Sequence, residues 1–104
     1  SMSLTPEQFE QTRQEIQANF KLTGLSKEQI ASDLRISRVK LDRLFELSQR
    51  SYNDPFIFRD YLCEKVVAAG HQPVPFSAMG EDVHHYWFLD PDIIERREMT
   101  PGDD

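Results

Sequence analysis

The chain has 104 residues, a formal net charge of −6 and a hydrophobic content of 38%, which includes seven Phe, three Tyr and one Trp. This length is typical of one domain, and the apolar content excludes general disorder. No apolar run is long enough to span a membrane. Because duplex DNA repels acidic surfaces, the net charge also excludes an indiscriminate nucleic-acid binder. We therefore expect a single domain over residues 1–104 with no membrane partner.

The charge is unevenly distributed along the chain. Residues 26–50 carry six basic and four acidic side chains, whereas residues 51–104 carry four basic and eleven acidic ones. The segment 26–50 is therefore the only locally basic part of an acidic protein. If the protein contacts nucleic acid, we expect the contact to lie in this segment.

Capping signals predict three helices in the N-terminal half. Thr5, which is followed by a proline and, three positions on, by a glutamine, has the pattern of an N-cap with a capping box and predicts a helix over residues 6–22. Ser26 begins a second capping box and a short second helix. Ser37 is the candidate N-cap of a third helix, in which apolar residues continue at helical spacing.

A fourth helix is predicted from Asp54, because an N-cap residue followed by Pro55 combines a cap with a fixed backbone dihedral. The segment is apolar around more than half of the helix circumference, so we expect it to be deeply buried. Gly70 ends this helix at the position where a left-handed residue is favoured.

Beyond the fourth helix the pattern changes from helical to extended. Residues 73–77 contain two prolines, which disfavour helix there, and the aromatic residues 85–89 are strand-like. We expect these two stretches to pair as a small β-hairpin. A short helix is predicted from Pro91 to about Met99, and residues 100–104 are predicted to be frayed.

Residues 27–46 resemble the bacterial helix-turn-helix over its full twenty residues. A small residue, Ala31, lies where the two helices must touch, and Ser37 caps the second helix immediately after the turn. The positions that must be apolar hold Ile30, Leu34, Ile36, Leu41 and Leu44. The family usually has glycine where this chain has Arg35, so either Arg35 tolerates an unfavourable backbone conformation or the turn differs slightly from that of the family. The expected fold is mainly α, a three- to four-helix domain with a helix-turn-helix, a small C-terminal β-hairpin and a short terminal helix.

The resemblance implies a DNA-binding protein that regulates transcription. The motif leaves an outward face on its second helix that consists of Ser37, Arg38, Lys40, Asp42 and Arg43. The residues it places at base edges in the major groove are Ser37, Arg38, Asp42 and Arg43, and those suited to phosphates are Lys27, Lys40 and Arg50. An alternative remains open, because the same three-helix core also occurs in proteins that bind no DNA. In that case the protein is a non-enzymatic interaction module that uses its acidic C-terminal half. The acidic residues Asp42 and Glu46 favour this alternative, because they would repel phosphates.

A wider resemblance covers nearly the whole chain. The segments 54–62, 73–77 and 86–89 look like those of a small family of uncharacterised proteins from lactic-acid bacteria and their relatives. This resemblance implies the fold and a bacterial source but no activity. The spacing between the helix-turn-helix and the fourth helix also resembles that of bacterial regulators with a helical ligand-binding domain. Because only residues 71–104 follow the fourth helix, we expect no built-in small-molecule sensor and no cofactor.

Other reactive side chains do not form a recognised catalytic or metal-binding pattern. Adjacent histidines on a strand, such as His84 and His85, point to opposite faces and cannot easily chelate one ion. Cys63 lies among apolar residues and is interpreted as a buried structural thiol. A single cysteine forms no internal disulfide, which is typical of a cytoplasmic protein. The sequence has neither a nucleophile elbow nor a phosphate-binding loop, so we do not expect an enzyme.

The aromatic cluster 85–88 has two interpretations that the sequence leaves open. The cluster could fold back over the helical core as a lid. It could instead form a homodimer contact, because aromatic side chains are enriched at the centres of interfaces. A dimer would supply the two-fold symmetry with which small helix-turn-helix proteins read two half-sites.

Overall fold

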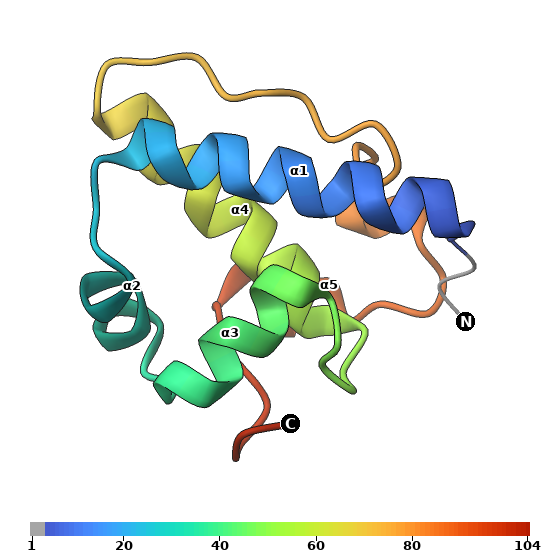
Figure 1. Cartoon of the computed structure of the whole chain (residues 1–104). Helices are drawn as coiled ribbons and strands as arrows, with labels where there is room; N and C mark the ends of the chain where they lie inside the picture. Colours follow the sequence, from blue (N-terminus) through green and yellow to red (C-terminus); the bar gives the residue numbers. More distant parts are fainter. Residues whose placement is uncertain (1–3) are drawn as a thin grey trace.

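The structure is a computed structural model that describes residues 4–104, and within this range every regular element is helical. The elements are α1 (Pro6–Thr23), α2 (Lys27–Leu34), α3 (Arg38–Glu46), α4 (Asn53–Ala68), the 3₁₀ helix η1 (Val83–His85) and α5 (Pro91–Glu95). The long helices α1 and α4 pack against each other, and α2 and α3 lie on one side of this pair (Figure 1). No helix in the described range has the length and apolar character needed to cross a membrane.

The predicted N-caps form as expected. Thr5 accepts a hydrogen bond from the Gln8 backbone N–H at 3.1 Å, and the Gln8 side chain accepts one from the Thr5 N–H at 2.9 Å, which completes the capping box of α1. Ser26 caps α2 and Ser37 caps α3 through the backbone N–H groups three positions on. These local hydrogen bonds fix where α1, α2 and α3 begin.

The hydrophobic core is built around α3 and α4, and α1, α2 and the segments after α4 also contribute buried side chains to it. Phe45 on α3 contacts Phe20 of α1 and Phe58 of α4, each edge to face with ring centroids 5.2 and 5.3 Å apart. Ala31 on α2 is buried, as its predicted place at the contact between two helices requires. The inner face of α3 is thus held against both long helices, and this leaves the opposite face of α3 to solvent.

The predicted cap of α4 is wrong. The helix begins at Asn53, and the hydroxyl of Ser51 accepts hydrogen bonds from the backbone N–H groups of Asn53 and Asp54 at 3.1 and 3.3 Å. The Asp54 side chain is fully buried and forms an ion pair with Lys40 of α3, with Nζ and Oδ2 3.1 Å apart. Asp54 also accepts hydrogen bonds from the N–H and hydroxyl of Thr100, at 3.0 and 2.6 Å.

The predicted β-hairpin is also wrong, because residues 73–82 and 86–90 form irregular segments and residues 83–85 form η1. Side chains of α1 take the backbone hydrogen bonds that a second strand would have satisfied. Asn19 accepts from the Val74 N–H and donates to the Val74 carbonyl, at 2.9 and 3.0 Å. The Glu15 carboxylate accepts from the N–H and hydroxyl of Ser77. The mainly helical prediction is confirmed, without the hairpin.

We expect Lys40→Met to lower the free energy of unfolding by about 3–5 kcal/mol, because it leaves the Asp54 carboxylate buried without its counter-charge. The double variant Lys40→Met/Asp54→Asn removes both charges and keeps groups that can hydrogen bond to Thr100, so most of the loss should be recovered. Urea unfolding monitored by circular dichroism measures both values. Lys21→Met, at an exposed position of α1, is the control. Equal stability of Lys40→Met and the parent would contradict this account.

Candidate nucleic-acid interface

The connection between α2 and α3 is a tight turn built around a left-handed residue. Arg35 has φ 56° and ψ 45°, and its backbone N–H donates to carbonyl oxygens of the last turn of α2. The N–H of Ile36 donates to the Ala31 carbonyl at 3.0 Å. Of the two alternatives for Arg35, the unfavourable backbone conformation is therefore the one present. It lets the chain reverse between Leu34 and the cap of α3 at Ser37.

A hydrogen bond between side chains holds α2 against α4. The Tyr61 hydroxyl donates to Asp33 Oδ2 at 2.6 Å, and Gln29 donates to the other carboxylate oxygen at 2.7 Å. The bond from Tyr61, followed by that from Gln29, lowers the pKa of Asp33 below its ordinary value. The hydrogen bond from Tyr61 to Asp33 thus links α2 directly to α4.

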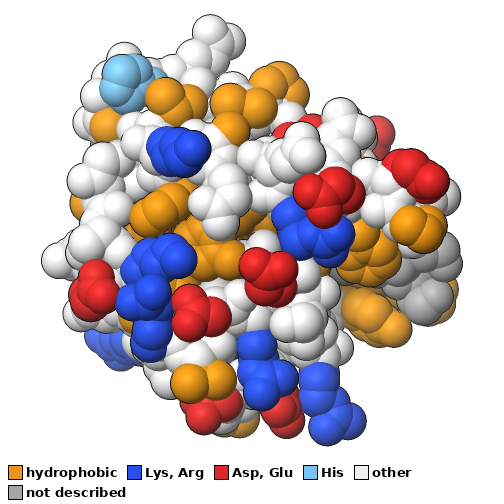
Figure 2. Space-filling model, in the orientation of Figure 1, with side chains coloured by type: hydrophobic (Ala, Val, Ile, Leu, Met, Phe, Trp, Pro, Cys, Tyr) orange, Lys and Arg blue, Asp and Glu red, His pale blue; other side chains and the backbone are white. Residues whose placement is uncertain are grey.

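The outward face of α3 carries basic and acidic side chains in close pairs. Arg38, whose side chain is 46% exposed, donates from Nη1 to Glu28 of α2 at 2.8 Å and from Nε to Asp42 at 3.1 Å. Arg43 is exposed on the same helix. Figure 2 shows Lys and Arg side chains interspersed with Asp and Glu over the part of the surface formed by α2 and α3. This face has mixed charge, and no continuous positive patch covers it.

Two of the predicted phosphate contacts occupy other environments. Lys40 is fully buried, so the expectation that it faces outward is wrong. The ammonium group of Lys40 binds Asp54 and donates to the backbone and hydroxyl oxygens of Thr100. Lys27 is half-buried, with its ammonium 4.9 Å from the centroid of the Phe45 ring. Arg50 is exposed, beyond the end of α3.

Residues 100–104, which we call the C-terminal tail, lie against α3 and the segment after it instead of being frayed. The Ser37 hydroxyl donates to Asp103 Oδ1 at 2.5 Å. The Arg50 guanidinium lies 3.8 Å from Asp104 Oδ2, and the Arg50 N–H donates to the Asp104 carbonyl at 3.4 Å. The tail thus meets Ser37, Lys40 and Arg50, three residues that the sequence assigned to DNA. No local sequence pattern announces this contact.

The remaining predicted residues are scattered. The imidazoles of His84 and His85 contact different acids, Glu95 and Glu81. Cys63 is half-buried, and burial raises the pKa of its thiol, which lowers its nucleophilicity at neutral pH. The aromatic cluster is split, because Tyr86 packs on Phe56 of the core at a centroid distance of 4.9 Å.

Trp87 in the same cluster is 87% exposed. The cluster thus divides between the two interpretations: Tyr86, which packs on Phe56, matches the lid, whereas Trp87 does not cover the core. The indole of Trp87 remains available to a partner.

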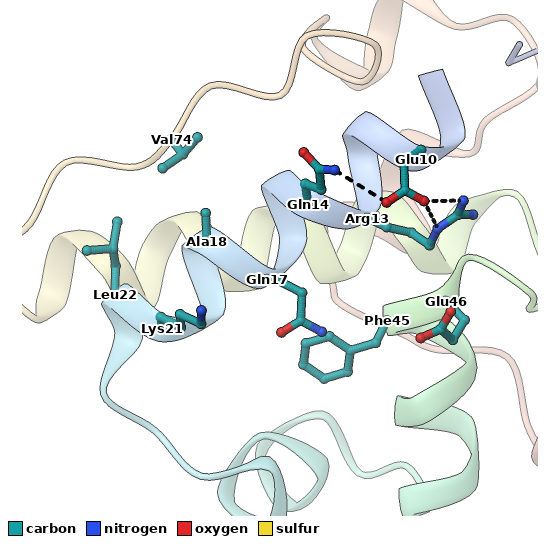
Figure 3. Close-up of a pocket in the computed structure, with 10 residues that line it drawn as sticks. All are labelled: Glu10, Arg13, Gln14, Gln17, Ala18, Lys21, Leu22, Phe45, Glu46 and Val74. Atoms are coloured by element: carbon teal, nitrogen blue, oxygen red, sulfur yellow. Dashed lines mark hydrogen bonds and ion pairs between the residues drawn. The ribbon is translucent and has the colours of Figure 1, made fainter. Parts of the chain in front are cut away.

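A groove with a volume of about 790 Å³ lies between α1 and α3 (Figure 3). Phe45 and Gln17 face each other across it, and Glu10 on its rim accepts hydrogen bonds from Arg13 and Gln14. The charged side chain of Glu10 is thus already paired within α1. The groove includes none of the side chains that the helix-turn-helix resemblance assigned to DNA.

The fold and this surface define a small helical protein in which two helices joined by a left-handed turn present a polar face of mixed charge. The chain belongs to the family described as uncharacterized protein conserved in bacteria (DUF2316), whose model matches residues 2–90. The matched range includes α1 to α4 and η1, whereas α5 and the C-terminal tail lie beyond it. Neither a curated protein nor a solved structure matched the chain.

We expect Arg35→Gly to raise the free energy of unfolding by about 0.5–1 kcal/mol. A left-handed conformation costs a residue with a Cβ roughly 1–2 kcal/mol, and glycine offsets part of that gain by its larger entropy in the unfolded chain. Arg35→Ala is the matched control, because it removes the same side chain but keeps the Cβ. If the glycine variant is no more stable than the alanine variant in urea unfolding, the turn is not strained at this residue.

Proposed function

We propose that the protein binds double-stranded DNA through the outward face of α3 and acts as a transcriptional regulator of the helix-turn-helix type. The observation that carries the proposal is the arrangement of α2 and α3 about the left-handed turn at Arg35. The buried inner face of α3 leaves Arg38, Asp42 and Arg43 on its solvent side. A helix that is rigidly held on one face and polar on the other is the element that enters a major groove in this class of protein.

The chemistry of these three side chains suits base edges better than phosphates. An arginine can donate two parallel hydrogen bonds to guanine, and an aspartate can accept one from the amino group of cytosine. The nearby acids Glu28 and Asp42 reduce the attraction of this face to phosphates in general. We therefore expect binding that is selective for sequence and weak on random DNA. Lys40 has no part in the proposal, because it is buried.

The test is selection from random duplexes at about 0.1 M salt, followed by titration of an enriched site and its single-base changes. Arg38→Ala and Arg43→Ala should each relax the preference at one base position, by about 1–3 kcal/mol of discrimination. Lys21→Ala is the charge-matched control, because it removes one exposed positive charge from α1. It should leave every base preference unchanged.

A folded protein that enriches no sequence would overturn the proposal. The interaction module that uses the acidic C-terminal half would then be the better account. Enriched sites with two-fold symmetry would indicate that two copies bind together, for which the exposed Trp87 offers a contact.

A further inference from the structure

The C-terminal tail places a carboxylate at the N-terminus of α3, where the proposed DNA contact begins. Backbone N–H groups that lack a partner give this end of a helix a partial positive charge, which favours anions. The Ser37 hydroxyl accepts from the Lys40 N–H and donates to Asp103, so one side chain links the helix end to the tail. A phosphate oxygen approaching α3 would meet the same hydroxyl and the same helix end.

The second acidic residue of the tail, Asp104, faces a second group that could bind phosphate, the Arg50 guanidinium. Both side chains are largely exposed to solvent. An exposed ion pair contributes little stability and is weakened by salt, so another anion can replace its carboxylate. Two acids of one short segment therefore occupy two groups on α3 and just beyond it that the sequence assigned to DNA.

The C-terminal tail is anchored at Thr100, which keeps its two carboxylates close to α3. Thr100 is held by the buried Lys40–Asp54 pair, through hydrogen bonds to both side chains. Only Pro101 and Gly102 separate this anchor from Asp103. A short tether keeps the carboxylates at a high effective concentration near α3, even though each contact is weak.

We propose that the C-terminal tail is an intramolecular competitor of DNA, a mask that Asp103 and Asp104 form over Ser37 and Arg50 in the free protein and that DNA phosphates displace. The inference rests on the proposed function of α3. Because only a fraction of molecules has the tail displaced at any moment, the mask lowers the apparent affinity for DNA by that fraction. Thr100 stays in place in both states, so the mask moves without unfolding the domain.

The experiment compares the full chain with Asp103→Ala/Asp104→Ala on an enriched duplex at about 0.1 M salt. We expect the tail variant to bind at least about fivefold more tightly, which is the low end of the usual coupling between sites. Glu7→Ala/Glu95→Ala removes the same charge from α1 and α5 and should leave the affinity unchanged. Urea unfolding of each variant checks that the buried network around Thr100 is intact.

The possible outcomes distinguish failure of the mask from failure of the proposed function. If the tail variant binds like the parent, or if both double variants gain equally, the mask is overturned and the proposed function stands. If the folded parent enriches no duplex, the proposed function falls, and the mask, which rests on it, falls with it. ¹⁵N relaxation should show residues 102–104 to be less mobile in the free protein than in the DNA complex. A tail that is already as mobile in the free protein as in the complex would overturn the mask.

Discussion

The buried ion pair between Lys40 and Asp54 is the interaction on which the arrangement of α3, α4 and the C-terminal tail depends. Both side chains have 0% exposure, and Thr100 completes the network by accepting from Lys40 and donating to Asp54. A buried pair gains little net stability over apolar side chains of the same volume, but a single unpaired charge there costs several kcal/mol, on the order of 3–5. The main effect of the network is therefore to fix the positions of α3, α4 and the C-terminal tail relative to one another. The donors and acceptors of all three groups are satisfied together only when the tail crosses α3 at Thr100.

Local signals allowed the helix starts and the turn to be predicted, because their partners are three or four residues away. Thr5, Ser26 and Ser37 cap helices in the structure as their sequence context indicated, and Arg35 adopts the left-handed conformation expected from the helix-turn-helix resemblance. Asp54 misled the same reasoning. Its sequence context is that of an N-cap, but its partner Lys40 lies on another helix, and the Ser51 hydroxyl accepts from the first backbone N–H groups of α4 instead.

The burial of Lys40 could have been predicted from spacing alone. The buried stripe of α3 consists of Lys40, Leu41, Leu44 and Phe45, a set of positions that lie on one face of a helix. A lysine in that stripe must find a buried acid, and Asp54 is the nearest candidate at the start of a buried helix. By contrast, no pattern in residues 71–90 predicted that side chains of α1 would take the hydrogen bonds expected from a second strand. Pro73 and Pro75 lack backbone N–H groups, so the few remaining donors could be satisfied by Asn19 and Glu15.

The acidic groups around α3 change what binding to DNA would require. In the free protein Arg38 already pairs with Glu28 and Asp42, Ser37 with Asp103, and Arg50 with Asp104. Under the proposed function, binding is therefore an exchange of intramolecular acids for DNA groups, and its net gain is smaller than the number of basic residues suggests. Phosphate contacts are the same on every sequence, so an exchange that nearly cancels them leaves base contacts as the main source of affinity. An acidic protein with a polar recognition face would in this way avoid random DNA and still hold a matched site.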